Sequence, residues 1–160
     1  MYKNLACALA AACCFLFPPS FSASAQSPPL KVGFVYVAPL TGAGWVHQHD
    51  QGRKALLAAI NPPGAPERVS ATYVENVAEG PDAERVIRDL ARQGHKLIFT
   101  PSFGYMEPTL AVAREFPDLR FESITGYKTA PNVATANARY YEGRYPVSYT
   151  HLTLPTNREV

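Results

Sequence analysis

Short apolar runs alternate with amphipathic helical segments along residues 31–136. The apolar runs are rich in β-branched and aromatic residues, as in strands that are covered on both faces. Helices that cross between successive strands place those strands parallel to one another. The sequence therefore predicts an α/β fold, a parallel sheet with flanking helices. The expected strands are 31–37, 69–75, 96–100, 120–125 and 133–136, and the expected helices begin at Trp45, near Asp82 and at Glu107.

Residues 31–56 combine the first strand, a glycine-rich turn and a helix that begins at Trp45, the single tryptophan of the chain. Ligands of open α/β sheets bind at the carboxyl ends of the strands, which is where Trp45 falls. A large aromatic face at such a place suits a flat or apolar ligand. Gly42 and Gly44 complete neither a dinucleotide-binding nor a Walker pattern, so they are predicted to be turn glycines.

Three more side chains are candidates for the same site. Phe103 and Tyr105 follow the third strand and could form one wall of it. The alternative is that Phe103 belongs to the core and Tyr105 packs on the rim. Glu142 begins the last predicted helix, where it could accept a hydrogen bond from a ligand amine. The alternative for Glu142 is a carboxylate that opposes the helix dipole.

Catalytic and metal chemistry find little support in the residues. His47 and His49 are two apart on a helix and point to different faces, which is a poor geometry for chelation. A ligand hydrogen bond from His49 is the better hypothesis. Ser102 lacks the flanking glycines of a nucleophile elbow. The rival hypothesis is an enzyme of flavodoxin-like or hydrolase type. It would need a nucleophile, a base and an orienting group that converge, and the sequence suggests no such set. No cofactor or metal is expected.

Residues 1–25 have the pattern of a secretory signal peptide. Lys3 precedes an apolar run, and Ala23-Ser-Ala25 offers a cleavage site. A membrane anchor or a buried N-terminal helix is the alternative. All three cysteines lie in this segment, so the mature chain has no disulfide. A lipid anchor on Cys13 is a minority hypothesis.

Residues 146–160 fit neither the helical nor the strand period. Within them, Val147 to Thr156 resembles the translated end of a common transposon sequencing adapter. We therefore expect 146–160 to be a non-native tail, and we assign His151 no role.

The charges are interspersed, with 15 Lys and Arg against 13 Asp and Glu. The charges form neither a basic stripe that would bind nucleic acid nor a polybasic segment that would tether the chain to a membrane. The expected partner is a small solute or another protein.

A set of short strings runs through residues 31–145 and carries a family resemblance. The strings are Val32-Gly-Phe-Val-Tyr-Val37, Gly44-Trp45, Gly52-Arg-Lys-Ala-Leu56, Tyr73-Val-Glu-Asn-Val77, Asp82-Ala-Glu-Arg-Val-Ile87, Gln93-Gly-His95, Leu97-Ile-Phe-Thr100, Ser102-Phe-Gly-Tyr105, Phe116-Pro-Asp118, Gly126-Tyr-Lys-Thr-Ala-Pro-Asn-Val-Ala134 and Tyr141-Glu-Gly-Arg-Tyr145. Together they resemble the basic membrane protein (BMP) family of periplasmic ABC-transporter substrate-binding proteins, which includes purine nucleoside-binding lipoproteins.

The resemblance implies a type I periplasmic-binding-protein fold, of which residues 26–145 would be the N-terminal lobe and the second lobe would be missing. Such proteins close on a solute between two lobes and deliver it to an inner-membrane ABC permease without chemistry. The implied solute is a purine nucleoside or a nucleobase such as adenine. Another small solute, an amino acid or a sugar, is the alternative.

The resemblance also suggests a role for Trp45. The family typically has Asp-Lys-Ser-Phe-Asn at this position, and its phenylalanine stacks on the base. Here Trp45 would keep the stacking face, whereas Val46 lacks the asparagine amide, which would favour a free base. Ser102 to Tyr105 match the second ligand-contacting loop of the family, and Glu142 matches a helix start near the hinge.

Overall fold

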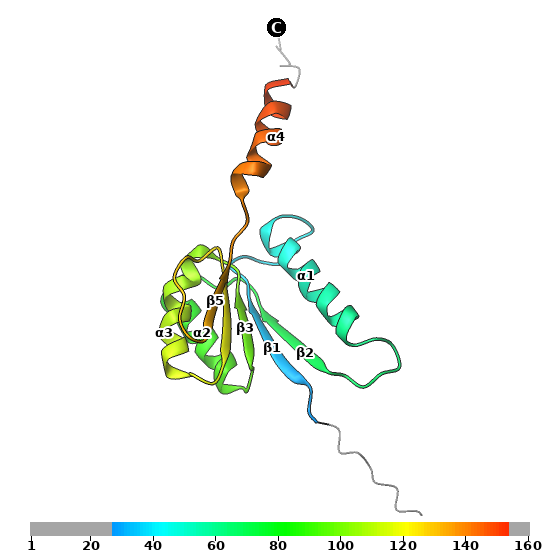
Figure 1. Cartoon of the computed structure of the whole chain (residues 1–160), viewed down its shortest axis with the longest axis vertical. Coiled ribbons are helices and arrows are strands. Elements are labelled where there is room, and N and C mark those ends of the chain that lie inside the picture. The colour runs from blue at the N-terminus through cyan, green and yellow to red at the C-terminus, as the bar shows by residue number, and fades with distance from the viewer. Residues whose placement is uncertain (1–26, 154–160) are drawn as a thin grey trace, which may run out of the picture.

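The computed structural model describes residues 27–153 and shows a five-stranded, all-parallel sheet of order β2-β1-β3-β4-β5 (Figure 1). This confirms the predicted α/β fold. The proposed signal peptide with Cys13 and the last residues of the proposed tail, 154–160, lie outside the described residues. The strands are β1 (Leu30–Val35), β2 (Val69–Val74), β3 (Leu97–Thr100), β4 (Arg120–Ile124) and β5 (Val133–Ala136). The helices are α1 (Trp45–Ile60), α2 (Pro81–Arg92), the 3-10 turn η1 (Phe103–Tyr105), α3 (Met106–Glu115) and α4 (Tyr140–Thr153).

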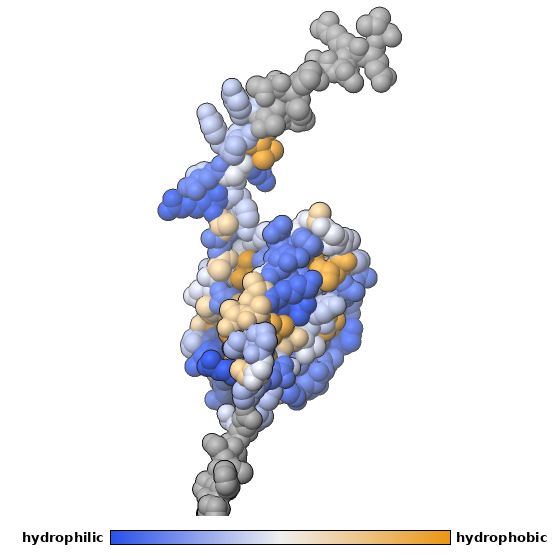
Figure 2. Space-filling model, turned by 90° about the vertical axis from the view of Figure 1, so that its right-hand side faces the viewer, coloured by the Kyte–Doolittle hydropathy of each residue, from blue (hydrophilic) through white to orange (hydrophobic). Residues whose placement is uncertain are grey.

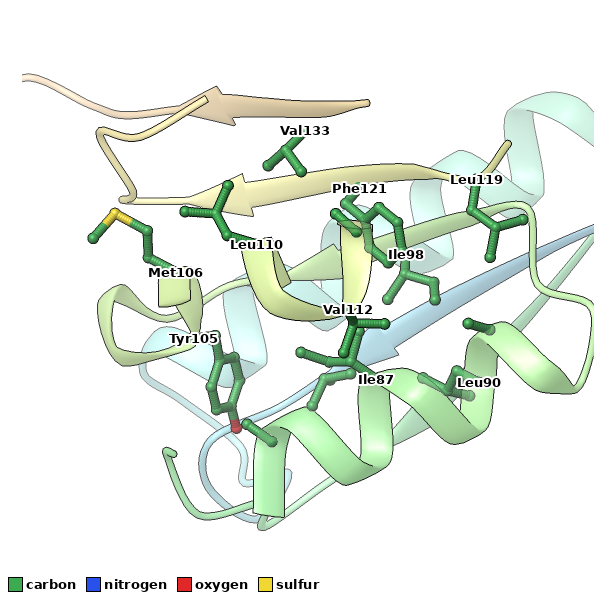
Figure 3. Packing of buried hydrophobic residues seen from close by; sticks show 14 of the residues in the cluster. Ile87, Leu90, Ile98, Tyr105, Met106, Leu110, Val112, Leu119, Phe121 and Val133 are labelled. Carbon is green, nitrogen blue, oxygen red and sulfur yellow. The ribbon is translucent and has the colours of Figure 1, made fainter. Parts of the chain in front are cut away.

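Helices α2 and α3 cover one face of the sheet and enclose the main core. Ala83, Ile87 and Leu90 of α2 are all buried in this core. Figure 3 shows the side chains of these two helices meeting Ile98 of β3 and Phe121 of β4. This layer holds the strands in place and fixes where their carboxyl ends lie.

Helix α1 lies on the other face, where it packs over β1 and β2. The sequence predicts a stripe of apolar and small residues through Trp45, Gly52 and Leu56, but the buried residues of α1 are Val46 and Asp50. Of this stripe, Gly52 and Leu56 line a groove of about 280 Å³, beside Phe99 and Ile124 of the sheet. The reason is that one helix covers only part of this face, so the side of α1 nearest β3 and β4 stays partly open.

Helix α4 rises from the carboxyl edge of the sheet and stands clear of the rounded body (Figure 1). The expectation that residues from 146 onward fit no helical period is wrong for 146–153, which continue this helix through Pro146. Ser148 Oγ donates to the carbonyl oxygens of Arg144 and Tyr145, so local bonds support the turn around the proline. Residues 140–149 are all exposed, as the missing apolar stripe implies. None of the helices within residues 27–153 is long and apolar enough to cross a membrane.

Candidate functional site

Two exposed aromatic side chains stand at the carboxyl ends of neighbouring strands. Trp45 follows β1 and is 40% exposed, and Phe103 follows β3 and is 59% exposed. Gly44, at φ 95°, begins α1 in a conformation that residues with a side chain rarely adopt. Trp45 Nε1 then donates to the carbonyl oxygen of Pro101 at 2.6 Å, which ties the start of α1 to the end of β3. The predicted placement of Trp45 and Phe103 at one edge of the sheet is therefore what the structure shows.

The indole of Trp45 offers a ligand its ring and no polar atom. Its only donor is already bonded to Pro101. His49 meets it in an edge-to-face contact at 4.6 Å between ring centroids, and Tyr140 lies at 6.2 Å. What this arrangement can do is stack on a flat ligand.

Phe103 is not a core residue, and its neighbour is an aromatic ring that sequence reasoning missed. Its ring centroid lies 6.1 Å from that of Tyr127, which is 68% exposed. Tyr127 follows the carboxyl end of β4, so the rule that singled out Trp45 and Phe103 could have found it as well.

Tyr105 does not line this edge. The structure buries its ring completely, and its hydroxyl donates to the carbonyl oxygen of Val77 at 2.6 Å. Burial, and then the charge of Glu79, raise the pKa of the phenol. A 3-10 turn rotates the chain by about 120° per residue, so side chains two apart, such as those of Phe103 and Tyr105, point in different directions. Tyr105 therefore pins two loops together and presents no surface to a ligand in this structure.

Glu142 stays within α4. Its carboxylate pairs with the Arg139 guanidinium at 3.2 Å, and both side chains are exposed. The structure brings Tyr140 to Trp45, but the partner of Glu142 is Arg139, the residue that immediately precedes α4.

Ser102, His95 and His47 do not come together as a catalytic set. Ser102 Oγ donates to Glu79 at 2.5 Å, whereas the buried His95 shares its hydrogen bond with the carbonyl oxygen of Leu90. His47 bonds to the carbonyl oxygen of Thr41, away from His49. Within the described part of the chain, no three His, Cys, Asp or Glu side chains gather as a metal site would require.

A buried ion-pair network holds the first half of α1. Asp50 is fully buried, and its two carboxylate oxygens pair with Arg53 at 2.7 Å and Lys54 at 2.8 Å. Arg53 also lies 4.8 Å from the ring centroid of Tyr73 on β2. Burial, and then the charge of Asp50, raise the pKa of Tyr36, the residue that follows β1, to about 12. The spacing of three and four residues was visible in the sequence, but the burial of Asp50 was not.

His49 is expected to be neutral at pH 7. Burial lowers the pKa of its imidazole from the ordinary value of 6.5. Because the unfolded chain binds this proton more readily, the stability contributed by neutral His49 is present above pH 6.5 and is lost as the pH falls below it. An NMR titration of the imidazole protons, assigned with His49→Gln, is expected to show a midpoint below 6.5. A midpoint at or above 6.5 would contradict the burial of this ring.

Known proteins resemble this chain in sequence and in fold. The family described as ABC transporter substrate-binding protein PnrA-like matches residues 30–150. A purine-binding protein of Brucella abortus is 58% identical over 116 residues, which are 72% of this chain and 32% of that protein. A protein of Haloferax volcanii, named as an ABC transporter glucose-binding protein, is 34% identical over 120 residues, 75% of this chain and 29% of that protein. The solved solute-binding protein of Conexibacter woesei shares the fold, with a TM-score of 0.59 at 23% identity over 68% of this chain and 35% of its own.

The chain thus spans about a third of the length of the curated relatives it matches. The family is one of binding proteins and not of enzymes, and ABC substrate-binding proteins are typically extracytoplasmic. The match extends over most of the chain. The matching family, Bmp, is the basic membrane protein family that the sequence predicts, so the predicted family is confirmed. The chain belongs to the PnrA-like family of ABC transporter substrate-binding proteins.

Proposed function

We propose that this protein binds a purine nucleoside or nucleobase, with adenine as the leading candidate, and that Trp45 stacks on the base. The observation that carries the proposal is the exposed indole face at the carboxyl edge, whose nitrogen is already committed to Pro101. A ring with no free donor recognises shape and π-surface, which every nucleobase has. The relative named as a purine-binding protein, 58% identical to this chain, supports the same solute class. Phe103 and His49 are proposed to border the base.

We propose further that residues 26–145 are one lobe of a two-lobed periplasmic protein, exported by the signal peptide at 1–25, that hands its solute to an inner-membrane ABC permease. The share of the relatives that the chain covers supports one lobe. We keep the proposal that 146–160 is a non-native tail, although the family match extends to residue 150. These proposals are tested with a full-length protein in which this lobe is followed by the second one.

A sugar is the second candidate solute. The relative from Haloferax volcanii is named as a glucose-binding protein and is 34% identical to this chain. Trp45 would suit the apolar face of a sugar ring as well as a base, so the two candidates must be separated by experiment.

A thermal-unfolding panel tests the proposal. A solute that binds only the folded protein, present at one hundred times its dissociation constant, stabilises it by about 2.7 kcal/mol. We expect adenine to raise the midpoint of unfolding, and glucose and amino acids to leave it unchanged. A rise with glucose alone would overturn the purine assignment in favour of the sugar. Conversion of a nucleoside to base and ribose would instead support the enzyme hypothesis.

A further inference from the structure

Two loops at the carboxyl edge are fastened to each other across the end of β1. Residues 75–80, which follow β2, reach over to Tyr36, whose carbonyl oxygen accepts the Val77 N–H at 3.0 Å. On the other side, the Val77 carbonyl oxygen accepts the buried hydroxyl of Tyr105 at 2.6 Å. The loop after β2 therefore lies beside the turn that carries Phe103.

The hydrogen bonds of Val77 place the side chain of Glu79 beside the turn that carries Phe103. Its Oε1 accepts the Ser102 hydroxyl at 2.5 Å, and Ser102 is the neighbour of Phe103 in the chain. A Cβ built on Gly104 would lie 2.1 to 2.5 Å from the carboxylate atoms of Glu79. Because Gly104 is not among the glycines with positive φ, its role is to leave room for the carboxylate and not to permit a special backbone.

The carboxylate of Glu79 can accept a further hydrogen bond. Glu79 is exposed, and among the ion pairs recorded for residues 27–153 it takes part in none. A carboxylate accepts hydrogen bonds through both oxygens, and Ser102 uses only one of them. An oxygen held beside the turn that carries Phe103, and not neutralised by a cation, is suited to a ligand that donates N–H bonds.

We infer that Glu79 is a specificity-determining residue that accepts a hydrogen bond from an amino group of the base. The inference rests on the proposed purine site and narrows its ligand to an aminopurine. Adenine carries an exocyclic amino group where hypoxanthine carries a carbonyl oxygen. A carboxylate facing that carbonyl would be left without a donor in a site closed to water, which is how polar sites reject analogues.

Isothermal titration of the full-length protein with adenine and with hypoxanthine tests the inference through the ratio of the two affinities. A hydrogen bond to a charged group corresponds to about 10- to 100-fold in affinity. Glu79→Gln is expected to lower the preference for adenine by at least about tenfold, within that range. Gly104→Ala should do the same, because its methyl group displaces the carboxylate without changing any charge. The double variant should be no worse than Glu79→Gln alone, since both changes act on the same contact: glutamine removes the charge that strengthens it, and the methyl group displaces the side chain.

Glu75→Gln is the matched control. Glu75 lies in the same loop, but its carboxylate accepts the Leu40 N–H at 2.6 Å, a bond that a glutamine oxygen can also accept. The preference for adenine should stay unchanged in this variant. If both Glu79→Gln and Gly104→Ala still bind purines and keep the wild-type preference for adenine over hypoxanthine, the role of Glu79 is overturned. The proposed purine binding would then still stand. If the wild-type protein binds neither purine, the proposed function itself fails. Circular dichroism shows whether each variant is folded. If one of Glu79→Gln and Gly104→Ala does not fold, the affinity ratio of the other variant tests the inference.

Discussion

Trp45→Ala in the full-length protein is expected to weaken adenine binding by about 1–3 kcal/mol, the range for losing one aromatic surface under a base. The indole presents its face at the carboxyl edge, 40% exposed, and is anchored by the bond from Nε1 to Pro101. Alanine removes both the surface and the anchor. Isothermal titration calorimetry measures the change directly.

Trp45→Phe separates the two contributions. Phenylalanine keeps an aromatic face but cannot donate to Pro101, so we expect a smaller loss than with alanine. Affinity that is unchanged in Trp45→Ala would remove this residue from the site. Equal losses in both variants would mean that the anchor, and not the stacking surface, is what matters.

Asp50→Ala is expected to destabilise the fold by about 3 kcal/mol, the lower end of the range for breaking a buried ion pair. The substitution leaves the Arg53 guanidinium, whose side chain is only 11% exposed, without its carboxylate. The cost stays at the lower end because the Lys54 side chain, 55% exposed, can return to water. Urea unfolding of the full-length protein measures the difference.

Asp82→Ala is the matched control for this experiment. Asp82 also faces an arginine three residues later, Arg85 at 3.7 Å, but both side chains are more than half exposed. We expect a cost below about 1 kcal/mol, as for other surface pairs. Similar losses in the free energy of unfolding for the two substitutions would show that the buried ion pairs of Asp50 stabilise the fold no more than an exposed pair does.

The same network gives the protein a defined response to acid. Burial on its own would raise the pKa of Asp50, but hydrogen bonds from Lys54 and Arg53 outweigh it and hold the pKa below the ordinary value of 3.8. The stability that ionised Asp50 contributes is therefore present above pH 3.8 and is lost as the pH falls through the lowered pKa. In Asp50→Asn this part of the acid response should be absent.

Local patterns were enough to predict the strands, where the helices begin, and the placement of Trp45 and Phe103 at one edge of the sheet. Trp45 and Phe103 each follow a strand, and a parallel sheet brings such positions to one edge. No longer-range knowledge was needed for that step, because the alternation of periods sets the topology.

The residues that were misplaced or missed depend on contacts between distant segments. Tyr105 is buried because Val77, 28 positions away, supplies its hydrogen-bond acceptor. The carboxylate of Glu79 reaches Ser102 only after a loop crosses the end of β1. Asp50 is on a helix whose buried side is set by how much of the sheet it covers. None of these facts has a periodic signature along the chain.

The most direct test of the account is a crystal structure of the full-length protein with adenine. We expect the purine ring to lie parallel to the Trp45 indole at van der Waals distance, with the bond from Nε1 to Pro101 kept. Adenine bound away from Trp45, or an empty site in crystals grown at saturating adenine, would contradict the account.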